Sequence, residues 1–322
     1  MILPIRIFLG DLSYNTIGMS TEVFPLNVGY ISAYCKKQFG SKVDITLFKY
    51  IDEIEAAIYE NPPDILGLSN YVWSYRIGLE MLNLASSQNP NVITVWGGPN
   101  FPQDLESQKS FMKDCPNVDF YVPIEGEIGF SNIVKEVLNI SEHNYKKEIL
   151  FKKPIDGCIS RNPDGSLQFS IPQIRTKELD EIPSPYLTGL MDKFFDGKLT
   201  PMIQTNRGCP FTCTFCVDGA DTVNRVNQFG LDRVSSELDY IAEHVSSNIH
   251  GLHISDLNFG MYPRDLEICD GIVNIQKKYN YPTRVLSTTG KNKKERIIQA
   301  IERLHGTMSL TMSVQSMDEQ IL

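Results

Sequence analysis

Short apolar runs alternate with amphipathic stretches along the first 140 residues. Five runs have the length of buried strands: 5–9, 43–48, 65–69, 92–96 and 120–123. Four amphipathic stretches repeat apolar positions at helical spacing: 25–39, 51–60, 75–89 and 128–138. Strands that alternate with helices are typical of a parallel sheet with helices on its faces. We therefore predict a five-stranded, doubly wound α/β domain over residues 1–140.

The pattern changes between residues 141 and 199 and then resumes. The turn Asn162-Pro163-Asp164-Gly165 predicts a hairpin between 157–161 and 167–171, within a connector that carries a small sheet element of its own. From Thr200 onward, four more strands are predicted: 201–205, 251–255, 284–288 and 308–314. Three helices follow the first three of these strands: 231–245, 264–278 and 294–304. Residues 200–322 are therefore predicted to form a second α/β domain.

Charge and hydropathy argue against two classes of partner. The chain has 30 basic and 39 acidic residues and a net charge of −9, which is the wrong sign for a protein that grips nucleic acid through phosphates. Its apolar stretches fall short of the ~20 residues that a membrane helix needs. Residues 1–10 lack the basic region and the cleavage site of a signal peptide. We expect a cytoplasmic protein that binds neither nucleic acid nor membranes.

Three of the seven cysteines lie within eight positions. Cys209, Cys213 and Cys216 form a C-x3-C-x2-C motif directly after the first predicted strand of the second domain. Three thiolates can hold three irons of a cubane cluster and leave the fourth iron open to a small molecule. A structural zinc site requires four ligands, and the nearest further candidates, His253 and Cys269, are not at zinc-ribbon spacing. The other four cysteines are expected to be small buried residues: Cys35, Cys115, Cys158 and Cys269.

Small and polar residues follow the predicted strands of the first domain. They are Gly10, Asp11, Ser69, Asn70, Gly97, Gly98, Pro99, Glu125 and Gly126. Ligands of doubly wound sheets bind outside the carboxyl ends of the strands, and small residues there let the backbone approach a ligand closely. Four such loops on one edge of the sheet predict a ligand site.

The cysteine motif, with Phe215 directly before its third cysteine, resembles the signature of the radical S-adenosylmethionine (SAM) superfamily. The resemblance implies a 4Fe–4S cluster on the three cysteines, with SAM bound to the open iron and Phe215 beside it. One-electron transfer from the reduced cluster would then cleave SAM and release a 5′-deoxyadenosyl radical that abstracts a substrate hydrogen. A flavodoxin or a ferredoxin would supply the electron.

Polar residues at the later strand ends match positions at which this superfamily contacts SAM. The resemblance assigns Asp256 and Asn258 to the methionine amino group, and it assigns Ser287, Ser313 and Gln315 to the ribose and the carboxylate. Asp256 or Asn258 could instead cap the helix that follows. The superfamily's barrel has six strands, whereas four are predicted here, so we expect a partial (β/α) barrel that is truncated after its fourth strand. Such a chain is expected to bind SAM poorly.

The first domain resembles the Rossmann-like cobalamin-binding domain that one subgroup of radical SAM proteins carries at the N-terminus. Four segments support the resemblance: residues 25–31, 97–99, 125–127 and 183–186. It implies that cobalamin binds along the loops of the predicted ligand site. The Asp-x-His-x-x-Gly motif that ligates cobalt in many such domains is absent, and the first histidine of the chain is His143. Tyr71, Trp73 and Tyr75 could pack over the corrin, although core packing is the more frequent role of such a cluster.

The resemblance implies a cobalamin-dependent methyltransferase that acts on an unactivated carbon or phosphorus of a small-molecule, peptide or natural-product substrate. Three alternatives stay open: ring closure or another radical rearrangement on the same cofactors, a methylthiotransferase-like enzyme, and a non-catalytic corrinoid-binding protein. A methylthiotransferase needs three further N-terminal cysteines for a second cluster. Cys35, Cys115 and Cys158 lie in unrelated predicted elements, which disfavours that alternative.

Overall fold

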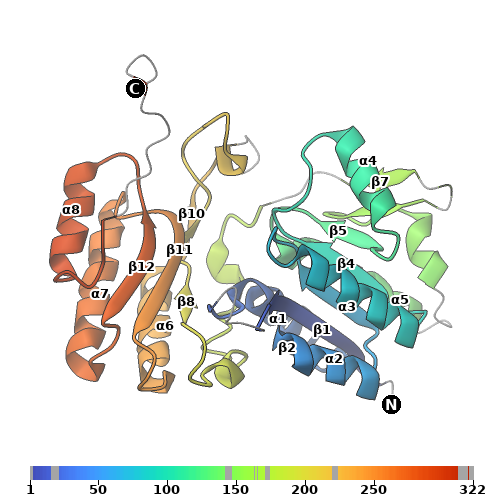
Figure 1. The fold of residues 1–322 in the computed structure, drawn as a ribbon, viewed down its shortest axis with the longest axis horizontal. Coiled ribbons are helices and arrows are strands. Elements are labelled where there is room, and N and C mark those ends of the chain that lie inside the picture. The colour runs from blue at the N-terminus through green and yellow to red at the C-terminus, as the bar shows by residue number, and fades with distance from the viewer. Residues whose placement is uncertain are drawn as a thin grey trace. The chain divides into compact units, whose positions relative to one another are not determined.

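The computed structural model describes residues 3–15, 22–141, 147–162, 164, 166–170, 175–219, 224–310 and 318. The chain forms two compact units (Figure 1). Unit 1 consists of Met1–Thr176 and Ile182–Leu190, and unit 2 consists of Lys177–Glu181 and Met191–Leu322. The chain therefore passes between the units three times.

Unit 1 contains a seven-stranded sheet in the order β2-β1-β3-β4-β5-β6-β7. Its strands are β1 (Ile5–Ser13), β2 (Val43–Tyr50), β3 (Ile65–Ser69), β4 (Ile93–Gly97), β5 (Phe120–Val122), β6 (Ile159–Arg161) and β7 (Leu167–Phe169). Strands β1 to β5 are parallel, as predicted. The predicted hairpin is also present, but β6 pairs antiparallel with β5, so it extends this sheet rather than forming one of its own.

Five helices cover the two faces of this sheet: α1 (Leu26–Phe39), α2 (Ile51–Glu60), α3 (Tyr75–Gln88), α4 (Leu105–Asp114) and α5 (Gly126–Ser141). Helices α2, α3 and α4 place Ile54, Leu82 and Met112 in one hydrophobic cluster with the strands. Helices α1 and α5 pack against each other. Phe130 of α5 lies against Gly67 of β3, which alternates with the residues of that cluster and therefore faces the other side of the sheet.

Helix α4 was not predicted from the apolar pattern. Met112 is its one buried residue, so the stretch has no apolar stripe. Its start is marked instead by Asp104, whose side chain accepts a hydrogen bond from Ser107 N at 2.9 Å. Such an N-cap satisfies a backbone N–H of the first turn, and it explains why a polar stretch forms a helix here.

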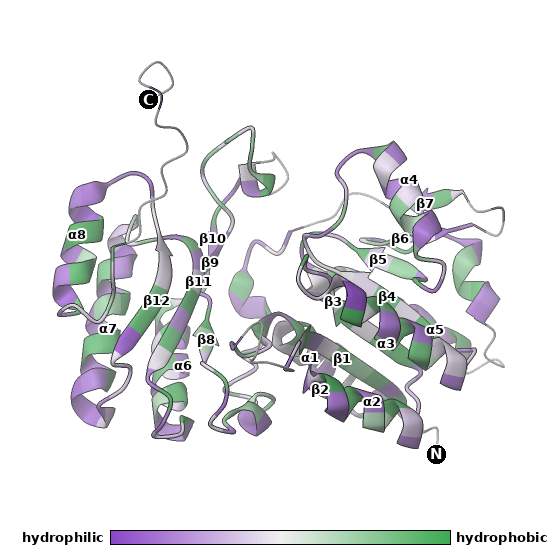
Figure 2. Cartoon of the chain, viewed as in Figure 1, coloured by the Kyte–Doolittle hydropathy of each residue, from purple (hydrophilic) through white to green (hydrophobic). Residues whose placement is uncertain are grey.

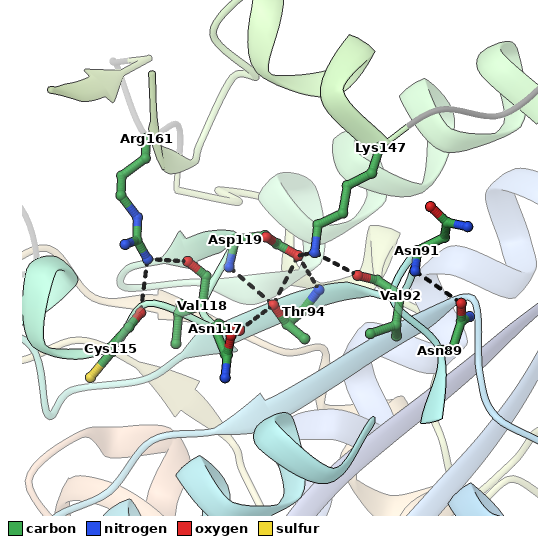
Figure 3. A network of polar contacts seen from close by, with 10 residues as sticks. All are labelled: Asn89, Asn91, Val92, Thr94, Cys115, Asn117, Val118, Asp119, Lys147 and Arg161. Carbon is green, nitrogen blue, oxygen red and sulfur yellow. Dashed lines mark hydrogen bonds and ion pairs between the residues drawn. The ribbon is translucent and has the colours of Figure 1, made fainter. Parts of the chain in front are cut away.

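A polar network at the amino-terminal ends of β4 and β5 anchors the 3₁₀ helix η2 (Lys147–Lys152) to the sheet (Figure 3). The Lys147 ammonium lies 2.7 Å from Asp119 Oδ2 and donates to Val92 O at 2.9 Å. Thr94 N donates to the same carboxylate oxygen at 2.8 Å. Figure 3 also shows Arg161 of β6, which donates to two loop carbonyls. The network joins the chain after α5 to the middle of the sheet.

Replacing Lys147 with methionine should lower the free energy of unfolding by about 1–2 kcal/mol, because it removes the cation from a mostly buried carboxylate. Lys153→Met is the matched control. Its ion pair with Glu136 leaves the lysine side chain 64% exposed, so we expect a loss below about 0.5 kcal/mol. Urea unfolding followed by circular dichroism measures both variants. Equal losses would show that the network does not stabilise the fold.

Unit 2 contains a three-stranded parallel sheet in the order β12-β11-β8. Its strands are β8 (Met202–Ile203), β11 (Gly251–Phe259) and β12 (Arg284–Thr289). An antiparallel ribbon of β9 (Asn206–Arg207) and β10 (Asn227–Gln228) follows β8. Three of the four strands predicted after Thr200 are thus confirmed. At the fourth, Met308 forms one bridge with Val285, but residues 311–317 lie outside the described residues, so the expected end of the barrel after this strand stays a prediction.

Three helices pack beside one another in unit 2: α6 (Leu231–His244), α7 (Pro263–Tyr279) and α8 (Lys294–Arg303). Alternate residues of strand β11 are buried, and both this strand and the helices carry hydrophobic and hydrophilic residues (Figure 2). The other short 3₁₀ helices of the chain are η1 (Gly40–Lys42), η3 (Leu179–Glu181), η4 (Asp192–Phe194) and η5 (Val217–Gly219). None of the helices in the described parts of the chain is both long and apolar enough to span a membrane.

Candidate functional site

The carboxyl ends of the parallel strands of unit 1 form the edge at which the ligand loops were predicted. The sheet order is β2-β1-β3, so the chain passes from β1 to β2 on one side and then crosses to β3 on the other side of β1. Doubly wound sheets bind ligands where the strand order reverses in this way. Because β1 runs to Ser13, Gly10 and Asp11 lie within the strand, and their predicted place in the loop after it is wrong. Gly10 instead allows close packing, since a Cβ there would lie 2.8 Å from Leu68 Cδ2.

Asp11 forms an ion pair with Lys49, near the end of β2. Lys49 Nζ lies 3.1 Å from Asp11 Oδ2, and the Lys49 side chain is fully buried. Burial, together with the nearby Asp11 carboxylate, raises the pKa of Tyr71 to about 12. Lys49 was missed in the sequence analysis. A lysine inside the apolar stretch 47–50 is the signal that could have identified it.

Asn70 holds two neighbouring loops of this edge together. Its side-chain amide donates to Asn100 O at 2.9 Å, and Asn100 Nδ2 donates back to Asn70 Oδ1 at 3.1 Å. The hydroxyl of Tyr121 donates to Gly98 O at 2.8 Å. Gly98 has a φ of 121°, and a Cβ there would lie 2.8 Å from Asn70 O, so this position requires glycine. Through its hydrogen bonds to Gly97 and Asn100, the buried Asn70 positions the segment 97–99, which is more exposed.

The loop after β3 carries two stacked aromatic rings. The ring centroids of Tyr71 and Trp73 lie 4.7 Å apart, and Trp73 is 47% exposed. The prediction of core packing is therefore wrong for Trp73. It is confirmed for Tyr75, which stacks on the buried ring of Trp96 at 5.2 Å. Ser69, at the end of β3, accepts a hydrogen bond from Asn27 Nδ2 of α1 at 2.9 Å, which joins the start of that helix to this edge.

Glu125 is held by the segment that follows the hairpin. Its Oε1 lies 2.9 Å from Arg175 Nε, and its Oε2 accepts a hydrogen bond from Thr176 N at 2.9 Å. The next residue, Gly126, begins α5 at a point where a Cβ would lie 2.5 Å from Ile31 Cδ1 of α1. Glu125 thus ties residues 175 and 176 to the edge, and Gly126 lets the two helices approach each other.

The C-x3-C-x2-C motif of unit 2 occupies the loop between β9 and β10. All seven cysteines, each within the described residues, are free thiols. Cys209 and Cys213 are half-buried and Cys216 is exposed, whereas the other four are buried. Hydrogen bonds from Cys216 N to Cys213 O, at 3.1 Å, and from Gly219 N to Cys216 O, at 3.0 Å, fold the loop into η5. The thiols of the motif are thus the ones that a ligand can reach.

Among the residues that the structure describes, no three His, Cys, Asp or Glu side chains come close enough to hold a metal ion. Three accessible thiols on one loop nevertheless fit, in kind and number, a 4Fe–4S cluster with one open iron. Phe215 is 65% exposed within this loop, and Lys291 Nζ lies 5.4 Å from its ring centroid.

Asp256 supports the start of the cysteine loop from β11. On the buried face of this strand, the apolar Ile254 is followed by Asp256 and Asn258. Asp256 Oδ1 accepts hydrogen bonds from Thr205 N at 2.7 Å and from Asn206 N at 3.2 Å. Its Oδ2 accepts from the Thr205 hydroxyl and from Asn206 Nδ2, the latter at 2.7 Å. Burial raises the pKa of this carboxyl to about 6.

The other residues expected to contact SAM have different surroundings. Asn258 Nδ2 lies 3.3 Å from Cys209 Sγ, so the structure brings this predicted ligand-binding residue to the cysteine loop. Ser287 is half-buried on β12. Ser313 and Gln315 lie outside the described residues.

The alternative role of Asp256 or Asn258 as a helix cap is wrong. Helix α7 begins at Pro263, and Asp265 in its first turn accepts a hydrogen bond from Tyr262 N at 2.9 Å. An acidic residue near a helix N-terminus also interacts favourably with the helix dipole. Asp256 and Asn258 are bound instead to the chain that leads into the cysteine motif.

The cysteines of unit 1 lie in separate elements. Cys35 is in α1, Cys115 follows α4 with its Sγ 3.3 Å from the Tyr75 hydroxyl, and Cys158 Sγ lies 3.4 Å from Gly129 O. Burial raises the pKa of all three thiols. Because these described cysteines lie in separate elements and form no common group of ligands, they do not support the second cluster of a methylthiotransferase.

Comparisons with known proteins agree with this arrangement. Residues 16–134 match the family model of the B12 binding domain. The chain is 29% identical to 2-(S-pantetheinyl)-carbapenam-3-carboxylate methyltransferase of Streptantibioticus cattleyicolor, over 95% of this chain and 45% of that protein. It is also 29% identical to the cobalamin-dependent radical SAM methyltransferase TokK of Streptomyces tokunonensis, with the same coverage of both chains.

The fold is similar to a solved structure as well. The apo structure of OxsB, a cobalamin-dependent S-adenosylmethionine radical enzyme, superposes with a TM-score of 0.64 at 19% identity, over 95% of this chain and 42% of that chain. The chain thus spans less than half the length of the relatives it matches.

Proposed function

We propose that the chain is a radical SAM protein with a B12-binding domain, and that it transfers a methyl group to an unactivated carbon or phosphorus. The observation that carries the proposal is the cysteine loop, in which three free thiols are accessible while the other four thiols of the chain are buried. The substrate would be a small molecule, a peptide or a natural product. The two sequence relatives support the reaction type, since both are methyltransferases.

In this proposal, Cys209, Cys213 and Cys216 hold a 4Fe–4S cluster. When bound, the cluster would supply the electron that cleaves SAM reductively. Asp256 fastens the start of the loop through its hydrogen bonds, and the hydrogen bond from Gly219 N closes its end. The exposed ring of Phe215 offers a flat apolar surface to the adenine of SAM.

Cobalamin would bind at the carboxyl edge of the unit 1 sheet. When bound, it would carry the methyl group to be transferred. The segment 97–99, which Asn70 positions, offers exposed backbone to the cofactor. The stacked pair of Tyr71 and Trp73 offers an aromatic surface to the corrin ring.

Anaerobic reconstitution with iron and sulfide tests the cysteine site. We expect about four irons and four sulfides per chain. Cys209→Ala should lose the iron, because it removes one thiolate ligand. The matched control is Cys269→Ala, which removes a buried thiol outside the motif. This variant should retain the iron. An iron content in Cys209→Ala equal to that of the unmodified protein would overturn the proposal.

Cobalamin binding is measured separately, from the visible spectrum of protein that has been incubated with hydroxocobalamin and freed of excess cofactor. A chain that retains cobalamin but takes up no iron would be a non-catalytic corrinoid-binding protein. A chain that takes up iron but no cobalamin would lose the methyltransferase assignment. When both bind, the mass of the product distinguishes methyl transfer from a ring closure on the same cofactors.

A further inference from the structure

Two side chains from neighbouring strand ends are directed at sulfur atoms of the cysteine loop. Asn258 Nδ2, near the end of β11, lies 3.3 Å from Cys209 Sγ. Lys291 Nζ, in the loop after β12, lies 3.9 Å from Cys213 Sγ. Two of the three cysteines of the motif therefore have an N–H donor within reach, one neutral and one cationic.

The position of Asn258 is fixed by a buried polar network. Asn258 is buried on the same face of β11 as Asp256, because alternate residues of a strand share a face. Asp256 binds Thr205 and Asn206, and two residues further along β11 Asn258 reaches Cys209. Two buried residues of β11 thus contact the segment between β8 and the cysteine loop. Asp256 binds the residues before the loop, and Asn258 contacts its first cysteine.

The position of Lys291 is supported by its neighbours. Gly290 N donates to Phe259 O at 3.2 Å, which ties the loop after β12 to the end of β11. The Lys291 ammonium also lies over the ring of Phe215, so it makes two separate contacts with the cysteine loop. Its side chain is exposed, so its effect on a nearby charge should depend on salt.

We propose that Asn258 and Lys291 raise the reduction potential of the cluster held by this loop, by donating to the sulfur atoms of Cys209 and Cys213. The proposal rests on the proposed function, because it requires a cluster on these cysteines. Reduction adds one electron, supplied by an external low-potential reductant, and makes the sulfur atoms better hydrogen-bond acceptors. Donors and cations beside the sulfur atoms therefore stabilise the reduced state more than the oxidised state.

The test compares midpoint potentials of the reconstituted protein in the absence of SAM, measured by electron paramagnetic resonance during stepwise reduction. Asn258→Leu and Lys291→Met should both shift the midpoint to more negative values. We expect about a tenfold lower ratio of reduced to oxidised cluster at the unmodified protein's midpoint, which corresponds to about 59 mV for one electron. Lys294→Met, which changes an exposed lysine in the first turn of α8, should leave the midpoint unchanged.

Salt separates the two contributions. The effect of Lys291→Met should shrink at about 1 M salt, where screening acts over roughly 3 Å. The effect of Asn258→Leu should persist, since its donor is neutral and buried. If Asn258→Leu fails to retain iron, the smaller Asn258→Ala, which adds no charge, decides the question. It removes the same donor and should shift the midpoint in the same direction.

The possible outcomes distinguish the two proposals. If the unmodified protein takes up no iron, the proposed function is overturned. If its cluster assembles but the variants share its midpoint, the role of Asn258 and Lys291 is overturned and the proposed function stands. If Asn258→Leu changes the midpoint only when SAM is present, Asn258 acts on SAM rather than on the cysteine, and its part of the inference is overturned.

Discussion

Replacing Asp256 with alanine should lower the free energy of unfolding of unit 2 by about 3 kcal/mol or more. The buried carboxylate accepts four hydrogen bonds from Thr205 and Asn206. Alanine leaves these donors without their acceptor, and a buried donor without an acceptor costs about 1–3 kcal/mol. Urea unfolding, together with hydrogen exchange of peptides that contain β8 and β9, measures the loss and locates it.

Two further variants separate hydrogen bonding from charge. In Asp256→Asn, the amide oxygen can still accept from the two backbone N–H groups, and the Thr205 hydroxyl can turn to accept from the new NH₂, but Asn206 Nδ2 loses its acceptor. We therefore expect a loss of about 1–2 kcal/mol, smaller than that of the alanine variant. Asp239→Ala, at an exposed position of α6, should change stability by less than about 0.5 kcal/mol. Equal losses for alanine and asparagine at position 256 would contradict the interpretation.

The Asp256→Asn variant should also change how stability depends on pH. Burial raises the pKa of the Asp256 carboxyl from 3.8 to about 6, and the nearby Asp265 adds to the rise. Between these values the folded protein keeps a proton that the unfolded chain has released, so stability falls as the pH rises through this window. Asparagine does not titrate. The stability of the unmodified protein relative to Asp256→Asn should therefore fall between about pH 4 and pH 6, and a constant difference would contradict the raised pKa.

Replacing Lys49 with methionine should lower the free energy of unfolding of unit 1 by about 3 kcal/mol. Methionine fills much of the space of the lysine stem but removes the cation that lies 3.1 Å from Asp11. Breaking a buried ion pair by removing one partner costs about 3–5 kcal/mol, because it leaves a charge in a poorly hydrated place. The lower value applies here, since the Asp11 side chain keeps 13% exposure. Urea unfolding followed by circular dichroism measures the change.

A double-mutant cycle isolates the ion pair. Asp11→Asn combined with Lys49→Met removes both charges, so its loss should be smaller than the sum of the two single losses by about 1 kcal/mol or more. Additive losses would show that the two side chains do not interact. Lys42→Met, at an exposed position in η1, controls for the general effect of removing a lysine and should change stability by less than about 0.5 kcal/mol.

Elements with strong hydrophobic periodicity could be predicted closely from the sequence. Strand β3 and helix α2 begin and end where the apolar pattern places them. Strand β1 was predicted too short, because Asp11 and Ser13 have the composition of a loop. Asp11 can lie in the strand because Lys49 neutralises it, and that partner comes from another strand.

Those parts of the candidate site that lie within a short stretch of the sequence could be predicted. The cysteine motif is visible as a spacing within eight residues. The roles of the polar residues at the strand ends are not local, because Asp256 binds a residue 51 positions away and Asn70 binds one 30 positions away. Glu125 pairs with a residue 50 positions away. Each looked like a ligand contact in the sequence, and its partner could be recognised only in the folded chain.

Each of the two units is built from two separate segments of the sequence, so neither can be produced alone by a single cut of the chain. The segment Ile182–Leu190 supplies unit 1 with Tyr186, which is fully buried and lies 6.0 Å from the ring of Phe24. The segment Lys177–Glu181 supplies unit 2 with Asp180, which accepts a hydrogen bond from Gly230 N at the start of α6 at 2.9 Å. A gene fragment that stopped at Thr176 would therefore lack part of its own aromatic core. To express either unit as a separate module, its two segments must be spliced together.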